Sequence, residues 1–262
     1  FSPQTIGAIA GRSVDSLFDP IRKTSMHKWH EENGAIFEDV GQWKRPYYYP
    51  KKGEDIHKAV NRECKSVRKS LGILDASTLG KIDLQGPDTA KFLNMIYTNA
   101  WSKLEVGSCR YGLMCNEHGM IFDDGVTSRL GENHYHMTTT TGGAARVMSW
   151  LEEFLQTEWL DMQVFCTSVT EQWSVLSISG PNARNFLSEL TDIDLSKESF
   201  PFMRFREGKV CGIDARVFRI SFTGELAFEI NIPARYGSYV WNEFMTHGKK
   251  YNITPYGTEA MH

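Results

Sequence analysis

The sequence has 262 residues, 41% hydrophobic and 23% charged, which is the composition of an ordinary globular chain. Its 29 Lys and Arg residues stand against 32 Asp and Glu residues, and the resulting net charge of −3 argues against a nucleic-acid partner. No apolar run approaches the roughly 18–20 residues that span a bilayer, so no membrane partner is predicted. Five scattered cysteines without a CxxC pair argue against a disulfide framework and favour a reducing cytoplasm.

The ends of the chain and its first 51 residues carry few regular patterns. The sequence begins at Phe1 rather than methionine and stops at His262, so it reads as a piece of a longer protein. Residues 1–51 lack the pattern of a signal peptide and indicate a linker and N-terminal extension before a domain over residues 52–262. Aromatic and basic residues gather over positions 43–50, where they could stack nucleic-acid bases. The acidic chain favours a loop whose rings pack on the domain face.

A strand, a Gly-Pro turn and a helix occur twice. Alternating residues 81–85 precede Gly86-Pro87-Asp88, and alternating residues 173–179 precede Gly180-Pro181-Asn182. Proline suits the first helical turn, and Asp88 and Asn182 are expected to satisfy free helix amides. Strand-rich stretches follow each helix, and an amphipathic helix is predicted over residues 54–70. The repeat, over residues 81–132 and 175–232, predicts an α+β fold of two similar α/β halves.

A hairpin turn predicted over residues 116–119 leads into a strand that carries two adjacent aspartates. Alternation places Asp123 on one face of this strand and Phe122 and Asp124 on the other. If the Phe122 face is buried, Asp124 becomes a carboxylate on an apolar face, which suggests a pterin or cation partner. The residues alone favour a solvated acidic pair at a strand end.

Two further polar positions leave their role open. Glu229 lies on the opposite face of its predicted strand from the alternating apolar residues, as a pocket carboxylate or a surface one. Thr140 belongs to a run of hydroxyls followed by two glycines, which suits either the cap of a helix beginning near Ala144 or contact with a ligand. The chain contains no phosphate loop and no GxGxxG fingerprint.

Patterns for metal binding and covalent catalysis are weak. His27 and His30 are three residues apart and His134 and His136 alternate, but neither pair has further ligands in register. Core or surface histidines are therefore expected, and no metal site is predicted. There is no Gly-x-Ser-x-Gly elbow and no cysteine in a nucleophile context.

Short motifs distributed along the chain carry a resemblance to a known family. One set comprises Gly72-Ile73-Leu74-Asp75-Ala76-Ser77, Gly86-Pro87, Tyr111, residues 119–124, Gly180-Pro181, Thr223-Gly224-Glu225 and Phe228-Glu229. A second set comprises residues 6–12, 18–22, 27–30 and 37–46. By the first set the chain resembles the folate-binding aminomethyltransferases, the family of the glycine cleavage T-protein. By the second it is more closely similar, over essentially its whole length, to the C-terminal folate-binding part of the alpha subunits of heterotetrameric sarcosine oxidases.

The resemblance implies a folate site. Asp124 matches the family's catalytic carboxylate beside the folate nitrogens, and Glu229 matches a glutamate that hydrogen-bonds the pterin ring. Further folate contacts are implied for Tyr111, Thr140, Leu79, Phe222 and Phe202. Leu79 and Phe222 stand where the family often has methionine and tyrosine. Met261 stands where the Gly-Ala-Arg-Asp motif has arginine, which favours the sarcosine oxidase branch over a T-protein.

The resemblance also implies a reaction and its setting. It implies transfer of the one-carbon unit from the iminium product of sarcosine (N-methylglycine) oxidation to tetrahydrofolate, giving 5,10-methylenetetrahydrofolate and glycine. This is the work of part of an oxidoreductase acting on CH–NH donors. Tetrahydrofolate is the expected cofactor here, with FAD, FMN and NAD only in other parts of the complex. The expected partners are the beta, gamma and delta subunits and the upstream half of the alpha subunit. A glycine cleavage aminomethyltransferase and a folate-binding or assembly module without turnover remain the alternatives.

Overall fold

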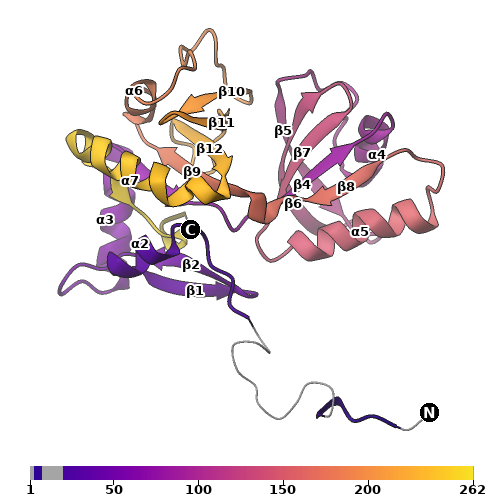
Figure 1. Cartoon of the computed structure of the whole chain (residues 1–262), viewed down its shortest axis with the longest axis horizontal. Helices are drawn as coiled ribbons and strands as arrows, with labels where there is room; N and C mark the ends of the chain where they lie inside the picture. The colour runs from indigo at the N-terminus through magenta and orange to yellow at the C-terminus, as the bar shows by residue number, and fades with distance from the viewer. Residues whose placement is uncertain (1–2, 8–19, 262) are drawn as a thin grey trace.

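The computed structural model describes residues 3–7 and 20–261. Parts of the N-terminal motifs, at residues 8–12 and 18–19, lie outside the described residues, as does His262. The described chain forms two lobes, each built on one sheet with helices packed against it (Figure 1). The prediction of an α+β fold with two similar halves is confirmed.

The first lobe contains a five-stranded sheet in the order β5-β6-β7-β4-β8. Its elements are β4 (Gly80–Gln85), α4 (Thr89–Ile96), β5 (Cys109–Cys115), β6 (Ile121–Gly131), β7 (His134–Thr139), α5 (Ala144–Thr157) and β8 (Phe165–Ser168). Ile82 and Leu84 of β4 and Tyr135 and Met137 of β7 share one apolar cluster with residues of α4 and α5. The alternate residues of these strands therefore face away from the helices.

The second lobe contains a six-stranded sheet in the order β10-β11-β12-β9-β3-β13. Its strands are β3 (Gly72–Asp75), β9 (Trp173–Ser179), β10 (Phe205–Val210), β11 (Ile213–Phe218), β12 (Ala227–Pro233) and β13 (Thr254–Pro255). Its helices are α3 (Ile56–Lys69), α6 (Ala183–Ser188) and α7 (Gly237–His247), with short 3-10 turns η1 (Thr170–Gln172), η2 (Ala234–Tyr236), η3 (Gly248–Tyr251) and η4 (Thr258–Met261). The main core lies between the sheet and α6 and α7, around Ile178, Phe186, Phe228 and Trp241.

The two sheets have the same strand order and exchange one strand each. The series β5-β6-β7-β4 of the first lobe corresponds to β10-β11-β12-β9 of the second. The next position beside β4 is filled by β8, which directly precedes the second repeat in sequence, and the position beside β9 is filled by β3, which precedes the first. Each sheet is thus completed by a strand from the segment leading into the other repeat.

The glycine turns after β4 and β9 accommodate these exchanged segments. Gly86 has φ +133°, and a Cβ there would lie 2.1 Å from the carbonyl oxygen of Gln163, just before β8. Gly180 has φ +123°, and a Cβ there would lie 2.5 Å from the carbonyl oxygen of Ser70, just before β3. Only glycine provides both the backbone angle and the space.

The predicted capping by Asp88 and Asn182 is wrong. Neither side chain caps its helix. The Asp88 carboxylate accepts a hydrogen bond from the backbone N–H of Gln163 at 2.9 Å, and the Asn182 amide donates to the hydroxyl of Ser70 at 3.0 Å. Both side chains instead hold the incoming exchanged strand, because that segment crosses directly beside the turn.

Residues 20–51 contain more regular structure than the linker pattern indicated. They form α2 (His27–Glu32) and an antiparallel hairpin of β1 (Ile36–Val40) and β2 (Trp43–Tyr48). Trp43 and Tyr49 are buried, so part of the aromatic cluster does pack inward, but from a strand and its end rather than from a loop. Gly41 closes the hairpin with φ +57°. The domain boundary between residues 51 and 52 stays a prediction.

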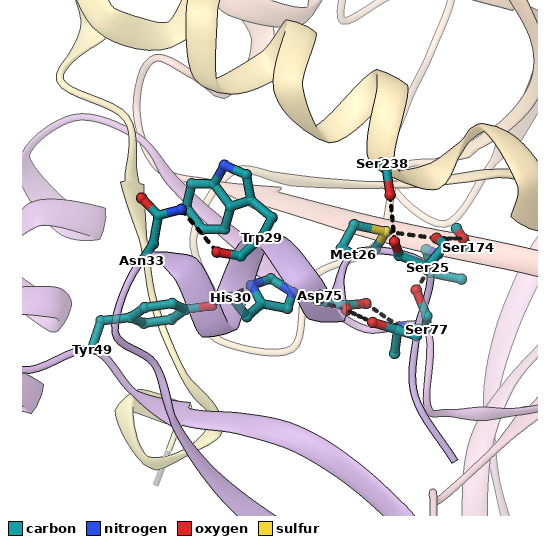
Figure 2. Close-up of polar contacts among 12 residues, drawn as sticks. Ser25, Met26, Trp29, His30, Asn33, Tyr49, Asp75, Ser77, Ser174 and Ser238 are labelled. Atoms are coloured by element: carbon teal, nitrogen blue, oxygen red, sulfur yellow. Dashed lines mark hydrogen bonds and ion pairs between the residues drawn. The ribbon is translucent and has the colours of Figure 1, made fainter. Parts of the chain in front are cut away.

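A buried polar network fixes this N-terminal segment to the second lobe (Figure 2). Nε2 of His30 lies 3.1 Å from a carboxylate oxygen of Asp75, and Nδ1 lies 2.9 Å from the hydroxyl of Tyr49. Thr24 and the backbone N–H of Ser77 also donate to Asp75, at 2.6 and 3.0 Å. Burial alone would raise the pKa of Asp75, but His30 and these hydrogen bonds outweigh it and lower the pKa.

The two lobes meet along the edges of their sheets. The backbone N–H of Cys109 at the start of β5 donates to Met203 just before β10, at 2.8 Å, and Phe205 donates back to Gly107 at 3.1 Å. Phe205, Phe218 and Ile220 of the second lobe form a small apolar cluster there with Cys109, Val126 and Leu130 of the first. The faces of β6 and β7 that point away from α4 and α5 therefore line the junction between lobes.

Candidate functional site

Asp124 lies on the junction face of β6, beside Tyr111 of β5. The Tyr111 hydroxyl donates a hydrogen bond to a carboxylate oxygen of Asp124 at 2.9 Å. Asp124 is half-buried and Tyr111 is 51% exposed. Desolvation and the adjacent carboxylate both raise the pKa of Tyr111, which keeps its hydroxyl protonated as a donor near neutral pH. The pair presents an oriented and accessible carboxylate.

The fully buried carboxylate of this strand is Asp123, not Asp124. Asp123 is 3% exposed and lies on the same face of the sheet as its buried strand partner Met114, whereas Phe122 is only half-buried, against Trp150 and Arg146 of α5. Because the Phe122 face is not fully buried, Asp124 does not lie on a buried apolar face. Nor is Asp124 a fully solvated surface group, because it is half-buried and bonded to Tyr111.

Thr140 directly follows β7 and lies next to the buried carboxylate of Asp123. Its backbone N–H donates to Asp123 at 3.2 Å, and its hydroxyl accepts from the backbone N–H of Gly143 at 3.1 Å. The hydroxyl thus supports the turn into α5, which begins at Ala144 as expected. The Thr140 side chain therefore lies beside the first turn of α5 and the Asp123 carboxylate.

Glu229 lies on β12 and faces away from the main core of the second lobe. Its strand neighbours are Ser177 of β9 and Phe218 of β11, and no described residue donates a hydrogen bond to its half-buried carboxylate. Desolvation raises the pKa of Glu229 to about 7, against the opposing effect of Lys81. A carboxylate left without protein donors is available to accept hydrogen bonds from a ligand.

Lys81 is a fully buried cation between the lobes, and the sequence patterns did not single it out. Its ammonium donates to the carbonyl oxygens of Ser77 at 2.9 Å and Leu79 at 2.7 Å. Desolvation lowers the pKa of Lys81 to about 7, opposed by the negative charges of Asp75 and Glu229. Lys81 therefore donates a hydrogen bond to the backbone of Leu79 and also stabilises the negative charge of Glu229.

The aromatic positions implied for folate lie at the surface of the second lobe. Phe222 is 74% exposed in the turn before β12, and Phe202 is 57% exposed in the segment before β10. The Arg219 guanidinium lies over the Phe202 ring, 5.4 Å from its centroid. Leu79 is different: it is half-buried and packs against a buried cluster that includes Leu74 and Val175.

The implied site residues thus form two groups, one from each side of the junction. Asp124, Tyr111 and Thr140 belong to the first lobe, with Asp123 bonded to two of them. Glu229 and Leu79 are joined through Lys81. Sequence reasoning did not select Asp123 because its neighbour Asp124 is the stronger candidate. It did not select Lys81 because the pattern of β4 gives no sign that this lysine is buried. Gly143, which leaves room beside Asp123, was the available signal for Asp123.

The histidine pairs have hydrogen-bonding roles. His134 and His136 both bond the carboxylate of Asp83, at 3.1 and 2.6 Å, on the junction face of the first sheet. His27 lies 3.1 Å from Glu31, while His30 belongs to the Asp75 network. Within residues 3–7 and 20–261, no group of three or more His, Cys, Asp or Glu residues could hold a metal ion.

The chain belongs to a known protein family. The family model described as GCVT N-terminal domain matches residues 26–262. In fold the chain is similar to the glycine cleavage system aminomethyltransferase T from Bartonella henselae, with a TM-score of 0.76 and 23% identity over 92% of this chain and 61% of that one.

Relatives with higher sequence identity carry two different names. Sarcosine oxidase subunit alpha from Corynebacterium sp. (strain U-96) is 56% identical over 264 aligned residues, which cover 100% of this chain and 27% of the relative. Aminomethyltransferase from Koribacter versatilis (strain Ellin345) is 30% identical, over 90% of this chain and 60% of the relative. The chain thus spans about a quarter of the length of the sarcosine oxidase subunits it matches. In the described part of the chain, no helix has the length and apolarity needed to cross a bilayer.

Proposed function

We propose that this chain binds tetrahydrofolate at the junction between its lobes and transfers to it the one-carbon unit of an iminium ion. The observation that carries the proposal is the Tyr111–Asp124 pair, an oriented carboxylate at a junction lined by polar groups from both lobes. The 56% identity to a sarcosine oxidase alpha subunit supports sarcosine as the amine whose oxidation supplies the iminium.

The residues present fit a folate. A pterin ring offers N–H donors along one edge, and the half-buried Glu229 carboxylate, without donors among the described residues, is an acceptor suited to them. Ionised Glu229 accepts hydrogen bonds better than the protonated form, so Lys81 favours binding by stabilising the charge on Glu229. Exposed Phe222 and Phe202 offer apolar rings at the surface of the second lobe.

Asp124 provides the electrostatic part of the mechanism. Its carboxylate attracts the cationic CH₂=NH⁺–R group and holds it against the folate nitrogens, an effect that a partly dehydrated site strengthens. When bound, tetrahydrofolate would supply two nitrogen nucleophiles, and the two protons that they lose would balance the two that the departing amine gains. Asp124 is placed to accept and return a proton during this exchange, a contribution typically worth about 10²–10⁴ in rate. Tyr111 keeps the carboxylate oriented.

The larger assembly follows as part of the same proposal. The flavins and NAD that oxidise sarcosine would lie in other parts of the complex, with the beta, gamma and delta subunits and the upstream half of the alpha subunit as partners, in the cytoplasm. Met261 at the family's arginine position favours this oxidase role over a standalone glycine cleavage aminomethyltransferase. The sequence relative named aminomethyltransferase, at 30% identity, makes the latter the second candidate.

Replacing Asp124 tests the proposal in the complete oxidase. Asp124→Ala should reduce 5,10-methylenetetrahydrofolate formation at least about 100-fold while sarcosine oxidation continues. The released iminium then hydrolyses, so formaldehyde replaces methylenetetrahydrofolate as the one-carbon product. Both products and oxygen uptake are measured in the presence of tetrahydrofolate.

Asp161→Ala, at an exposed aspartate of the same lobe, is the matched control and should leave the product ratio unchanged. Equal loss of oxidation and transfer in Asp124→Ala would remove Asp124 from this role. Aminomethyl transfer from a lipoyl carrier protein by the unmodified protein would instead favour the second candidate.

A further inference from the structure

The backbone ladder between β6 and β7 stops before it reaches Asp124 and Thr140. Backbone pairing runs from Gly131 and His134, through a register shift between Gly131 and Arg129, to Thr127 and Met137. Beyond that point side chains bridge the two segments. The Thr138 hydroxyl accepts from the backbone N–H of Val126 at 3.0 Å and donates to its carbonyl at 3.1 Å. The strands therefore separate where the proposed folate contacts begin.

The next bridge is the side chain of Asp123. One oxygen, Oδ1, accepts a hydrogen bond from the backbone N–H of Asp124 at 2.8 Å and from that of Thr140 at 3.2 Å. A single carboxylate oxygen thus joins the backbone of the two first-lobe residues matched to the family's catalytic aspartate and pterin-contacting position. No other contact across the opening involves both residues in the described part of the chain.

The second carboxylate oxygen of Asp123 lies in an environment that is unfavourable for a charged group. The turn into α5 does not by itself require a carboxylate there. Oδ2 is buried and has no hydrogen-bond partner among the described residues. It lies against Gly143, where a Cβ would come within 2.1 Å of it. Burial raises the pKa of Asp123, and hydrogen bonds from the backbone of Asp124 and from the backbone and side chain of Thr140 act against that rise. A costly buried acid at such a place points to a role in setting geometry.

We propose that Asp123 is a positioning residue: by holding the N–H groups of Asp124 and Thr140 on one carboxylate oxygen, it sets the spacing of the two side chains at the folate site. Gly143 leaves the room that the carboxylate occupies. This inference rests on the proposed function, and it assigns Asp123 no direct contact with substrate or folate.

Amide hydrogen exchange in the complete protein tests the clamp without any ligand. In Asp123→Ala, exchange at the amides of Asp124 and Thr140 should rise about five- to tenfold, while exchange at Val126 stays unchanged. The matched control Thr138→Val should do the reverse, raising exchange at Val126 alone. Asp123→Asn keeps an acceptor oxygen and should restore protection at both amides.

Folate binding tests whether the clamp positions the site. With 5-formyltetrahydrofolate as a stable probe, Asp123→Ala should raise the Kd at least about tenfold, the equivalent of one lost hydrogen bond or more. Asp123→Asn should stay within about threefold of the unmodified protein. Gly143→Ala, whose Cβ would displace the Asp123 carboxylate and the neighbouring Thr140 hydroxyl without removing either, should reproduce the loss if Asp123→Ala fails to fold.

Each result has a definite meaning. Faster exchange at both amides together with weaker binding, both reversed by asparagine, supports the proposal. Faster exchange with unchanged Kd overturns it, as does an Asp123→Asn variant that binds as poorly as Asp123→Ala, since charge rather than acceptance would then be responsible. Failure of the unmodified protein to bind the probe is a separate result, which contradicts the proposed function.

Discussion

At the scale of single residues, the junction holds ionisable groups that are unfavourable for stability. Glu229 and Lys81 both have pKa values moved to about 7 by desolvation, Glu229 upward and Lys81 downward. Each charged form is therefore less stable in the folded protein than in the unfolded chain. A protein under selection for stability alone has no reason to keep both, whereas a site that must bind a polar ring does.

The pH dependence of stability should reveal the cost of Glu229. Its folded pKa of about 7 lies above the ordinary 4.5, so the folded state loses stability as pH rises through that interval. Glu229→Gln removes this loss and should raise the free energy of unfolding at about pH 8 by about 1–2 kcal/mol, a figure reduced for partial exposure. At about pH 4 the variant and the unmodified protein should be equal.

Urea unfolding at the two pH values measures this difference. Glu152→Gln, at an exposed glutamate on α5, serves as the control and should show no pH-dependent gain. A gain for Glu229→Gln at low pH, or none at high pH, would contradict the assignment. The same variant should bind the folate probe more weakly, because it loses a charged acceptor.

At the scale of elements, the repeated strand–turn–helix unit depends on two glycines for a reason beyond the turn. Gly86 and Gly180 each lie against the backbone that delivers the exchanged strand, and Asp88 and Asn182 bond that same segment. The repeat therefore preserves the crossing of the two lobes as well as the fold of each one.

Alanine at these glycines separates the two requirements. Gly212 has φ +78°, and beyond its chain neighbours no atom lies within 4 Å of the place a Cβ would take, so Gly212→Ala should cost only the backbone preference, about 1 kcal/mol. Gly180→Ala adds the clash with Val67 and Ser70 and should cost about 2–4 kcal/mol. Chemical unfolding of both variants gives the comparison. Similar losses in the two variants would show that the crossing tolerates a methyl group.

At the scale of the whole molecule, the N-terminal segment is a structural part of the second lobe. The Asp75 network lies between α2 and the end of β3, and Glu63 of α3 accepts from the backbone of Tyr49 and Gly257. Chain segments far apart in sequence are thus tied by buried polar groups. Leaving one of these groups without its partner is expensive.

Asp75→Asn should destabilise the fold by about 3–5 kcal/mol, because the buried His30 and Thr24 lose a charged partner. The ion pair of Arg22 and Glu171 is the contrast: its side chains are 37% and 66% exposed, so Glu171→Gln should change stability by less than about 1 kcal/mol. Thermal or urea unfolding of both variants measures the difference. A small loss for Asp75→Asn would show that water replaces the carboxylate.

The sequence predicted the repeated elements well because local signals define them. Alternation located β4 and β9, and the Gly-Pro turns located the starts of α4 and α6. The exchange of β3 and β8 could not be predicted, since both are short strands whose partners depend on tertiary packing. The role of Asp123 could not be predicted for the same reason. Alternation correctly placed Asp123 and Asp124 on opposite faces of β6, but the burial of each face depends on α5 and on the other lobe.

The exchange of strands also governs the order in which the chain can fold during synthesis. The four residues of β3 are all buried in the finished sheet, yet their antiparallel partner β9 leaves the ribosome only after the whole first lobe has been made. Until then β3 is an apolar edge with unpaired backbone groups, the kind of segment that recruits chaperones or associates wrongly. The first lobe closes earlier, when β8 emerges and reaches β4. The nascent chain therefore completes its lobes in sequence, and β3 is the segment that most needs protection in the interval.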